Sequence, residues 1–369
     1  MGLLFNNSFV QGQALDVILV HNNKDQFACN EFNVSFPQKG LVRIHLNGVY
    51  VEGLDMESTT AKKMCRFVHS VPNDTKKPEA LQPLLDKLAT SMHTSSSTSS
   101  SNQQEQQKSH SLCFHLVDSS SGVVRGTAYA NMFVWKSCDR LIVCDIDGTI
   151  TKSNVRGAWD TILTESYRHV HDGVTTFLQQ LLLMGDDRQH VHHVIYVTSR
   201  PMSLATTTRK FLQNLQQDAT KLPAGPLFCN LRDMGSVLAS ELLWKDIHHH
   251  KLNMLTNQIV VPYNQVAVDV SSATTATPPL LFVAGFGNAI TDTMTYNMAG
   301  IPKPRIYQIN KQGKITCFDR TNDLYLLQQQ HTTKRQHTSC YSPFEGTIFQ
   351  GYTDPNLLED VQSKLLNRR

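Results

Sequence analysis

The stretch LIVCDIDGT, residues 141–149, places a run of β-forming apolar residues directly before two carboxylates. An apolar run without polar interruption is typical of a strand covered on both faces inside a parallel sheet. Because side chains alternate along a strand, we expect Asp145 and Asp147 on the same side of its last residues, with Gly148 starting a loop. Open α/β sheets bind ligands at the carboxyl ends of their strands, so this stretch predicts both a fold class and a site.

Two neighbouring carboxylates need a cation to offset their repulsion. A Mg²⁺ ion that bridges Asp145 and a substrate phosphate would stabilise the pair and leave one carboxylate oxygen free to attack phosphorus. Asp147 could then protonate the leaving oxygen and later activate water. The plainer interpretation, a strand followed by an acidic turn, leaves the second acid unexplained.

The composition is that of a globular protein. The 369 residues are enough for two domains, and 40% hydrophobic residues are enough to build their cores. The net charge of +3 comes from 34 basic and 31 acidic residues mixed along the chain, which argues against nucleic acid as a partner. The eight cysteines are scattered without a CxxC pair, so reduced, mostly buried thiols and a cytoplasmic location are expected.

No segment has the pattern of a membrane span or of a secretion signal. The apolar runs are shorter than the ~20 residues that a span requires. The first charged residue is Asp16, so no basic region precedes an apolar one. The apolar residues of MGLLF, 1–5, with Phe9 and Val10, could touch a bilayer surface or pack on the first domain.

The chain divides into β-patterned, low-complexity and α/β-patterned parts. Strand-like segments fill residues 14–68, and β-patterning resumes in CFHLVD and VRGTAYANMFVW. Between them, residues 93–111 contain no aliphatic or aromatic side chain, which predicts a flexible tether. The expected division is a β-sandwich domain from 1–70 and 111–136, a Ser/Gln-rich linker at 71–110, a parallel-sheet α/β domain at 137–318 and a carboxy-terminal helical extension at 319–369.

Predicted strands and helices alternate beyond residue 141, which is the pattern of a parallel sheet. A helix begins after Asp172, the strand VHHVIYVTS follows at 191–199, and another helix begins at Pro201. A last buried strand, LLFVAGFG at 280–287, ends in the polar NAITD. The segment RIYQIN and a hairpin around KQGK complete the domain.

Polar residues that suit phosphoryl transfer follow these strands. Such a reaction needs metal ligands, a phosphate-binding hydroxyl and a fixed cation. Thr198 and Ser199 supply hydroxyls, and the Arg200 guanidinium can grip phosphate bidentately. Asn288 and Asp292, one helical turn apart, offer oxygen donors for Mg²⁺ or orient its ligands.

A lysine and several histidines follow in the same half of the chain. Lys245, in ELLWKDIHHHK, is a candidate to hold the nucleophile and the phosphate together. The histidines at 190–193 and 248–250 argue only weakly for zinc, because adjacent side chains in one run cannot all converge on one ion.

The order DxDGT, strand-terminal Thr/Ser, lysine and late acid resembles the motif set of the haloacid dehalogenase superfamily. The segments DIDGTITKSN, HVHDGV, YVTSRPMSLATTTRKFL, LPAGP, AGFGNAITD and GIPKPRIYQIN resemble, in order and spacing, the lipin-type Mg²⁺-dependent phosphatidate phosphatases. The amino-terminal ALDVILVHNNKDQFACNEFNVSF is similar to the amino-terminal segment of the same family. The resemblance implies a dehalogenase-like domain beside an immunoglobulin-like β-sandwich.

Carried over by position, the resemblance implies a nucleophile at Asp145 and an acid/base at Asp147. The expected site comprises the catalytic residues Asp145, Asp147, Thr198 and Lys245, the substrate-binding residues Gly148, Thr149, Ser199 and Arg200, and the Mg²⁺ ligands Asp145, Asp147, Asn288 and Asp292. The chain departs from the family where KKPE becomes KDIH, which makes Lys251 a rival of Lys245. It also has Asn154 where Asp is usual and Ala289 where Arg is frequent.

The expected function is a peripheral, Mg²⁺-dependent phosphatidate phosphatase that yields diacylglycerol through an aspartyl-phosphate. Its expected partners are phosphatidic acid and an anionic membrane surface, visited transiently at the endoplasmic reticulum or the nuclear membrane, with no transmembrane segment. Two alternatives stay open: a phosphatase of the same superfamily acting on a soluble phosphomonoester, and a non-catalytic phosphatidate sensor. Related sensors lack the paired acids, so Asp145 and Asp147 favour an enzyme.

Overall fold

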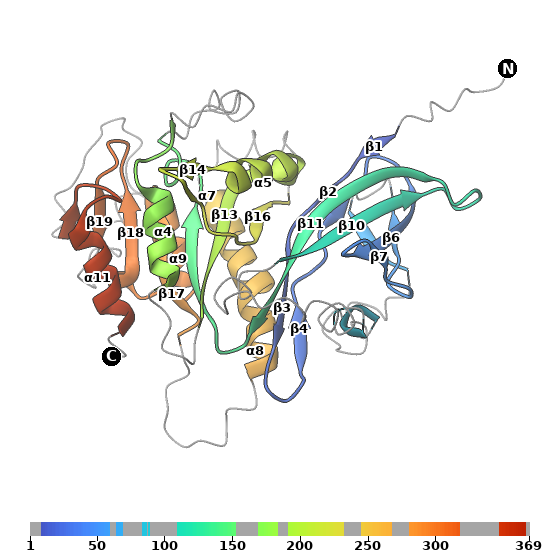
Figure 1. The fold of residues 1–369 in the computed structure, drawn as a ribbon, viewed down its shortest axis with the longest axis horizontal. Helices are drawn as coiled ribbons and strands as arrows, with labels where there is room; N and C mark the ends of the chain where they lie inside the picture. Colours follow the sequence, from blue (N-terminus) through green and yellow to red (C-terminus); the bar gives the residue numbers. More distant parts are fainter. Residues whose placement is uncertain are drawn as a thin grey trace.

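A computed structural model describes residues 9–59, 64–68, 83–86, 88, 109–152, 169–183, 191–231, 245–267, 280–317 and 347–366. Figure 1 shows an α/β part, which holds the later elements of the chain, beside a β-rich part that holds the earlier ones. No helix in these ranges is both long enough and apolar enough to cross a membrane.

The α/β part is built on a seven-stranded sheet of mixed direction. Its strand order is β16-β13-β12-β17-β18-β19-β20. Neighbouring strands from β16 to β18 are parallel, whereas β18, β19 and β20 pair antiparallel, which confirms the predicted parallel sheet. The bounds are β12 Arg140–Asp145, β13 His192–Pro201, β16 Leu227–Asn230, β17 Phe282–Gly287, β18 Ile306–Ile309, β19 Ile315–Cys317 and β20 Thr347–Phe349.

Strand β12 buries alternate side chains in two different cores. Ile142 and Cys144 face the core that holds residues of helices α4 and α5 and of helix α11. Leu141 and Val143 face the core that holds residues of a π-helical turn and of helices α8 and α9. The helices are α4 Val174–Leu183, α5 Ala205–Asn214, α7 Lys245–Asn253, the π-helical turn Met254–Val260, α8 Val261–Ala267, α9 Ile290–Met298 and α11 Pro355–Leu366.

Two predicted helices are confirmed. Helix α4 buries the apolar positions expected after Asp172, among them Phe177 and Leu181. The helix expected from Pro201 begins with a 3₁₀ turn, Met202–Leu204, and continues as α5.

At the centre of the sheet, the order in which successive strands are added reverses. Strand β12 lies between β13, the next strand in the sequence, and β17, which comes much later. In an open α/β sheet, a crevice for ligands forms at such a point, outside the carboxyl ends of the strands. Asp145 is the last residue of β12, so it lies at the carboxyl end of the central strand, where this general rule places a ligand site.

The β-rich part contains a nine-stranded sheet. Its path is β4-β3-β11-β10-β6-β8-β9, with β1 on β11 and β7 on β6, and a small β2-β5 pair stands apart. The bounds are β1 Val10–Gln11, β2 Gln13–Ala14, β3 Val17–His21, β4 Phe27–Cys29, β5 Val34–Ser35, β6 Gly40–Leu46, β7 Val49–Tyr50, β8 Met56–Ser58, β9 Cys65–Phe67, β10 Ser109–Val117 and β11 Val124–Lys136.

Strands from both sides of the Ser/Gln-rich stretch pair in this sheet. Strand β10 follows that stretch and pairs with β6, which precedes it, in the register Leu112↔Leu46. Most of the predicted linker, including residues 93–108, lies outside the described residues. Leu84 and Leu88 fall within the predicted linker range, yet both are buried in the core of this sheet.

A buried ion pair joins the β-rich part to the α/β part. Asp16 has no exposed surface, and its Oδ1 accepts hydrogen bonds from Arg209 Nε at 2.9 Å and from the Asn131 backbone N–H at 2.7 Å. Its Oδ2 accepts the Leu227 backbone N–H at 2.9 Å. Arg209 on α5 also donates to the Ala14 carbonyl at 2.8 Å. The contact therefore fixes α5 and β16 against the amino-terminal strands.

One of the histidines at 190–193, considered above as zinc ligands, is buried against other side chains. His193 Nε2 lies 3.0 Å from Asp139 Oδ2, and its ring stacks on Trp135 with 4.3 Å between centroids. These contacts account for the burial of His193 between the two parts of the molecule.

Candidate active site

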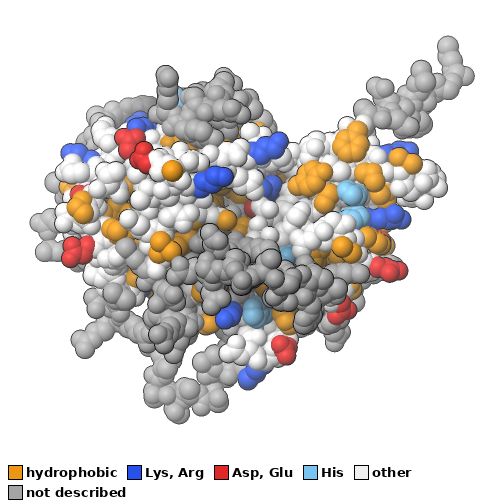
Figure 2. Space-filling model, in the orientation of Figure 1, with side chains coloured by type: hydrophobic (Ala, Val, Ile, Leu, Met, Phe, Trp, Pro, Cys, Tyr) orange, Lys and Arg blue, Asp and Glu red, His pale blue; other side chains and the backbone are white. Residues whose placement is uncertain are grey.

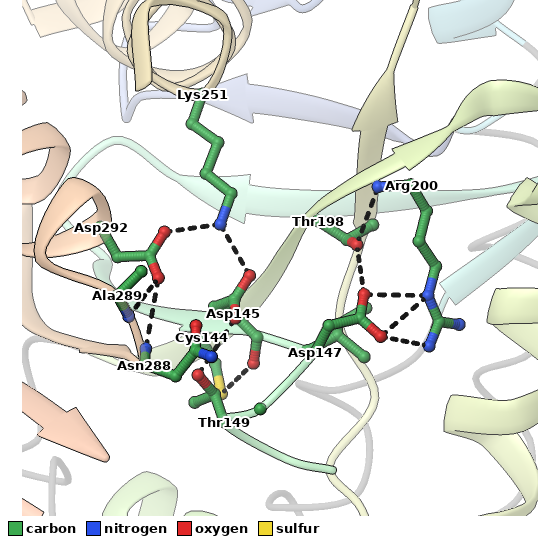
Figure 3. Close-up of polar contacts among 12 residues, drawn as sticks. Cys144, Asp145, Asp147, Thr149, Thr198, Arg200, Lys251, Asn288, Ala289 and Asp292 are labelled. Carbon is green, nitrogen blue, oxygen red and sulfur yellow. Dashed lines mark hydrogen bonds and ion pairs between the residues drawn. The ribbon is translucent and has the colours of Figure 1, made fainter. Parts of the chain in front are cut away.

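The loop after β12 forms a tight turn next to the Asp145 carboxylate. The Ile146 carbonyl accepts the backbone N–H groups of Ile150 at 2.9 Å and of Thr151 at 3.1 Å. Gly148 has φ of 85°, a left-handed conformation that a residue with a Cβ adopts at a cost. Thr149 Oγ1 donates to Asp145 Oδ2 at 3.1 Å, so the loop holds one oxygen of the carboxylate (Figure 3).

A lysine from helix α7 holds the other oxygen. Lys251 Nζ donates to Asp145 Oδ1 at 2.7 Å and to Asp292 Oδ1 at 2.6 Å. Its side chain is only 6% exposed. Lys251, the rival of Lys245 in the sequence, therefore contacts the predicted nucleophile, whereas the side chain of Lys245 lies outside the described residues.

Asp292 stands at the start of helix α9 and faces the same lysine. Its Oδ2 accepts the backbone N–H groups of Asn288 at 3.2 Å and of Ala289 at 3.1 Å. A Cβ at Gly287 would come within 2.5 Å of the Asp292 Cβ, so the glycine permits this close approach. The strand-to-helix turn thus fixes Asp292 beside Asp145, with the backbone of Asn288 at its base.

The second acid of the pair has its own partners. Arg200 Nη2 donates to Asp147 Oδ1 at 2.6 Å, and Arg200 Nε donates to Oδ2 at 2.9 Å. Thr198 Oγ1 donates to Asp147 Oδ2 at 3.1 Å. Thr198 and Arg200, both expected from the sequence to meet phosphate, therefore contact Asp147 in this structure, and Ser199 between them is half-buried.

The two acids differ in exposure as well as in partners. The Asp145 side chain is 4% exposed, whereas that of Asp147 is 27% exposed. Figure 3 shows them on separate sides of the loop, Asp145 toward Lys251 and Asp292, and Asp147 toward Thr198 and Arg200. The carboxylate of Asp145 is thus held on both oxygens and buried, whereas that of Asp147 is partly exposed.

When Asp145, Asp147 and Asp292 are all ionised, these three carboxylates face two cations, Lys251 and Arg200, among the described residues of the site, which leaves one net negative charge. Burial raises the pKa of Asp145 to about 7; Lys251 opposes this rise, and the Asp292 and Asp147 carboxylates add to it. Burial would lower the pKa of Lys251, but Asp145 and Asp292 raise it above its ordinary value, so the ammonium stays charged. The remaining negative charge favours a further cation.

The donor atoms fit a magnesium ion better than a transition metal. No three His, Cys, Asp or Glu side chains within the described ranges are grouped closely enough to ligate a metal by themselves. Mg²⁺ is usually held by one or two carboxylates, waters and substrate phosphate, and does not require such a group. Asp145 and Asp292, already drawn together around Lys251, provide two such carboxylates.

Two contacts at the site were not predicted from the sequence. Arg200 Nη1 donates to Thr208 Oγ1 on α5 at 3.2 Å, and the Tyr352 hydroxyl donates to the Thr149 carbonyl at 3.1 Å. Thr208 lies in the Thr-rich ATTT segment, and its spacing of eight from Arg200 is the one local hint. Tyr352 lies 203 residues from Thr149, so no motif could have linked them.

Comparison with known proteins places the chain in a family. The family model LNS2 (Lipin/Ned1/Smp2) matches residues 94–334, which is more than half of the chain. The chain is 30% identical over 186 residues to "Phosphatidic acid phosphohydrolase 1" of Saccharomyces cerevisiae, covering 50% of this chain and 20% of that protein. It is 33% identical over 198 residues to "Nuclear elongation and deformation protein 1" of Schizosaccharomyces pombe, covering 53% and 27% respectively.

A third relative is human "Phosphatidate phosphatase LPIN3", 28% identical over 188 residues, covering 50% of this chain and 19% of that protein. The chain therefore matches only about a fifth to a quarter of the length of these relatives. The matched residues 94–334 include both acids of the DxD pair, Lys251 and Asp292. The chain belongs to the LNS2 (Lipin/Ned1/Smp2) family.

Proposed function

We propose that the chain is a Mg²⁺-dependent phosphatidate phosphatase that converts phosphatidic acid to diacylglycerol. The observation that carries this proposal is that the two acids differ in burial and in hydrogen-bond partners. Asp145 is buried with one oxygen held by Lys251 and the other by Thr149, whereas Asp147 is partly exposed and held by Arg200 and Thr198. Relatives named as phosphatidate phosphatases support the lipid substrate.

Asp145 would act as the nucleophile. Its carboxylate attacks the phosphorus of the substrate, the bond from phosphorus to the diacylglycerol oxygen breaks, and an aspartyl-phosphate forms. Lys251 and Thr149 hold the carboxylate in one orientation, which limits the motion that precedes attack. The positive charge of Lys251 also lies where negative charge gathers on the transferred group.

Asp147 would act as the acid and then as the base. In its protonated form it gives a proton to the departing diacylglycerol oxygen, and the carboxylate that remains then removes a proton from the water that hydrolyses the aspartyl-phosphate. The second step releases phosphate and returns both acids to their starting forms. Arg200 and Thr198 orient Asp147 during both transfers.

Mg²⁺ would be held by Asp145 and Asp292, with Asp147 and Asn288 nearby, and would supply neutralisation of the phosphate charge. The net negative charge of the described site residues and their exclusively oxygen donors support this choice. Gly148 and Ser199 complete the proposed surroundings of the phosphate.

We also propose the domain division suggested by the sequence, with one adjustment. Residues 1–70 and 111–136 would form an immunoglobulin-like β-sandwich, supported by the largely antiparallel nine-stranded sheet and its own core. Residues 137–318 would form a haloacid dehalogenase-like domain. Because β20 and α11 contribute to the sheet and core of that domain, residues 347–366 are assigned to it and not to a separate helical extension.

The proposed enzyme would act at the surface of an anionic membrane, at the endoplasmic reticulum or the nuclear membrane. Phe9 and Tyr129 are 61% and 49% exposed, and strands β1 and β11 pair at Val10↔Gly126. Figure 2 shows exposed hydrophobic side chains on the β-rich part of this face. The expected docking segment MGLLF, residues 1–5, lies outside the described residues. Exposed apolar side chains next to that segment support a docking surface here.

One assay tests chemistry, metal and substrate class together. Phosphate release would be measured from phosphatidate in mixed micelles and from soluble phosphomonoesters, each with Mg²⁺ and with a chelator. We expect release from phosphatidate that depends on Mg²⁺. Release only from the soluble substrates would identify a different phosphatase, and binding of phosphatidate vesicles without any release would identify a sensor.

A further inference from the structure

The segment 347–366 lies outside the residues matched to the family, yet it reaches the loop under the proposed nucleophile. We propose that Tyr352 is a positioning residue whose hydroxyl fixes the Thr149 peptide and, through Thr149, the Asp145 carboxylate. This inference rests on the proposed function for its kinetic consequence, but the contact itself can be tested without any turnover.

Two hydrogen bonds in series connect Tyr352 to the nucleophile. The Tyr352 hydroxyl donates to the Thr149 carbonyl at 3.1 Å, and the Thr149 hydroxyl donates to Asp145 Oδ2 at 3.1 Å. All three residues are buried, with exposures of 5%, 0% and 3%. Water therefore has little access to replace either bond, and a change at Tyr352 is transmitted to the carboxylate through a single residue.

The peptide between Thr149 and Ile150 is held at both of its polar atoms. Its N–H donates to the Ile146 carbonyl at 2.9 Å, and its C=O accepts the Tyr352 hydroxyl. The next carbonyl, that of Ile150, accepts the backbone N–H of His171 at 2.9 Å. If the tyrosine hydroxyl is removed, the Thr149 carbonyl loses its buried donor and the peptide can turn to find another.

The ring of Tyr352 is held by packing that does not involve its hydroxyl. Its centroid lies 5.3 Å from that of Phe177 on α4, 6.5 Å from that of Phe286 on β17 and 6.3 Å from that of the His171 ring. A phenylalanine would keep these contacts, so the effect of the hydroxyl can be measured separately.

The segment is anchored on both sides of Tyr352. Before it, β20 pairs with β19; after it, Leu357 and Val361 of α11 are buried in the core. Asp354 closes the intervening turn by accepting the backbone N–H groups of Gln350 at 2.9 Å and Asn356 at 3.0 Å. The segment therefore presents the hydroxyl to the loop from a fixed base.

The tyrosine is also held in the form that donates. Burial raises its pKa well above the ordinary value, and Cys144 and Asp145 add to the rise. The hydroxyl consequently keeps its proton at neutral pH.

The test compares Tyr352→Phe with a matched control, Tyr196→Phe. Tyr196 lies in register with Cys144 on the neighbouring strand and is 1% exposed, but its hydroxyl donates to the Pro223 carbonyl at 2.7 Å and not to the Asp145 loop. Each variant loses one buried hydroxyl that donates to a backbone carbonyl. In the full chain with phosphatidate micelles and Mg²⁺, we expect kcat of Tyr352→Phe to fall about 10- to 100-fold with KM within about twofold, and Tyr196→Phe to retain both values.

Amide hydrogen exchange provides a readout that does not depend on catalysis. Peptides covering 146–151 should exchange faster in Tyr352→Phe than in the wild type, and Tyr196→Phe should leave them unchanged. Equal kinetics for the two variants, or faster exchange in both, would overturn a positioning role. If the wild type releases no phosphate, the proposed function fails, and the exchange comparison still decides the inference.

A second variant covers the case in which Tyr352→Phe does not fold. Asp354→Ala removes the acceptor that closes the turn after Tyr352, at a position that is not part of the buried core. We expect it to speed exchange of 146–151 and to lower kcat in the same direction as Tyr352→Phe. Unchanged exchange and unchanged kcat in this variant would overturn the inference.

Discussion

Lys251 Nζ lies 2.7 Å from Asp145 Oδ1, with both side chains buried. This contact favours Lys251 over Lys245 as the lysine of the proposed site. We predict that Lys251→Ala lowers turnover of phosphatidate about 10²- to 10³-fold, because the charge beside the transferred phosphoryl group is lost. Lys245→Ala should stay within about threefold of the wild type. Steady-state phosphate release checks both, and the opposite ranking would transfer the role to Lys245.

Arg200 tests whether the second motif serves Asp147 or the phosphate. Arg200→Lys keeps the charge but loses the fork that donates to both Asp147 oxygens. If Arg200 orients the acid/base, kcat should fall about 10-fold or more with little change in KM. A rise in KM at constant kcat would instead indicate that Arg200 grips the substrate, as the sequence suggested.

The raised pKa of Asp145 predicts a pH dependence of metal binding. Below about pH 7 in the metal-free protein, the carboxyl carries a proton, which must leave before the group can bind a cation. The apparent affinity for Mg²⁺ should therefore rise as pH increases from 5.5 to 8, with proton release on binding. Calorimetric titration in two buffers of different ionisation enthalpy measures this, and Asp145→Asn should remove the proton release. Affinity that is independent of pH in the wild type would contradict the prediction.

The buried pair between Asp16 and Arg209 predicts a stability effect far from the chemistry. Asp16→Ala leaves the Arg209 guanidinium buried without its counter-charge, so the free energy of unfolding should fall by about 3–5 kcal/mol. The exposed pair between Lys152 and Asp172 is the control, and Asp172→Ala should change stability by less than about 1 kcal/mol. Denaturant unfolding compares the two variants, and a similar small effect in both would show that the pair does not tie the two sheets together.

Local patterns in the sequence predicted the scaffold well. The apolar run before Asp145 and the alternation of strands and helices can be recognised from short stretches of consecutive residues. The sheet confirms the parallel arrangement that they predict. Helix α4 buries the expected face for the same reason. Thr149, predicted to bind substrate, donates to Asp145 in the structure, and this short-range contact was not predicted.

Pairings between distant segments were the part that local patterns could not supply. Lys251 and Asp145 are 106 positions apart, so no local pattern ranks Lys251 above Lys245. The contact of Arg200 with Asp147 depends on how two neighbouring strands are arranged, which local patterns do not reveal. The sequence therefore predicts that the guanidinium binds phosphate, whereas in the structure it binds Asp147. Leu84 and Leu88 were assigned to the linker because the core that they enter is formed by strands elsewhere in the chain, and the residues around them do not indicate that core.

The most direct test of the central proposal is phosphate release from phosphatidate micelles by the wild type and by Asp145→Asn, both with Mg²⁺. The substitution keeps the shape of the side chain and removes the nucleophilic carboxylate. We predict that the wild type releases phosphate and that the variant, with a similar melting temperature, is slower by at least ~10³-fold. A variant that retains more than about a tenth of wild-type turnover would contradict the assignment of Asp145 as the nucleophile.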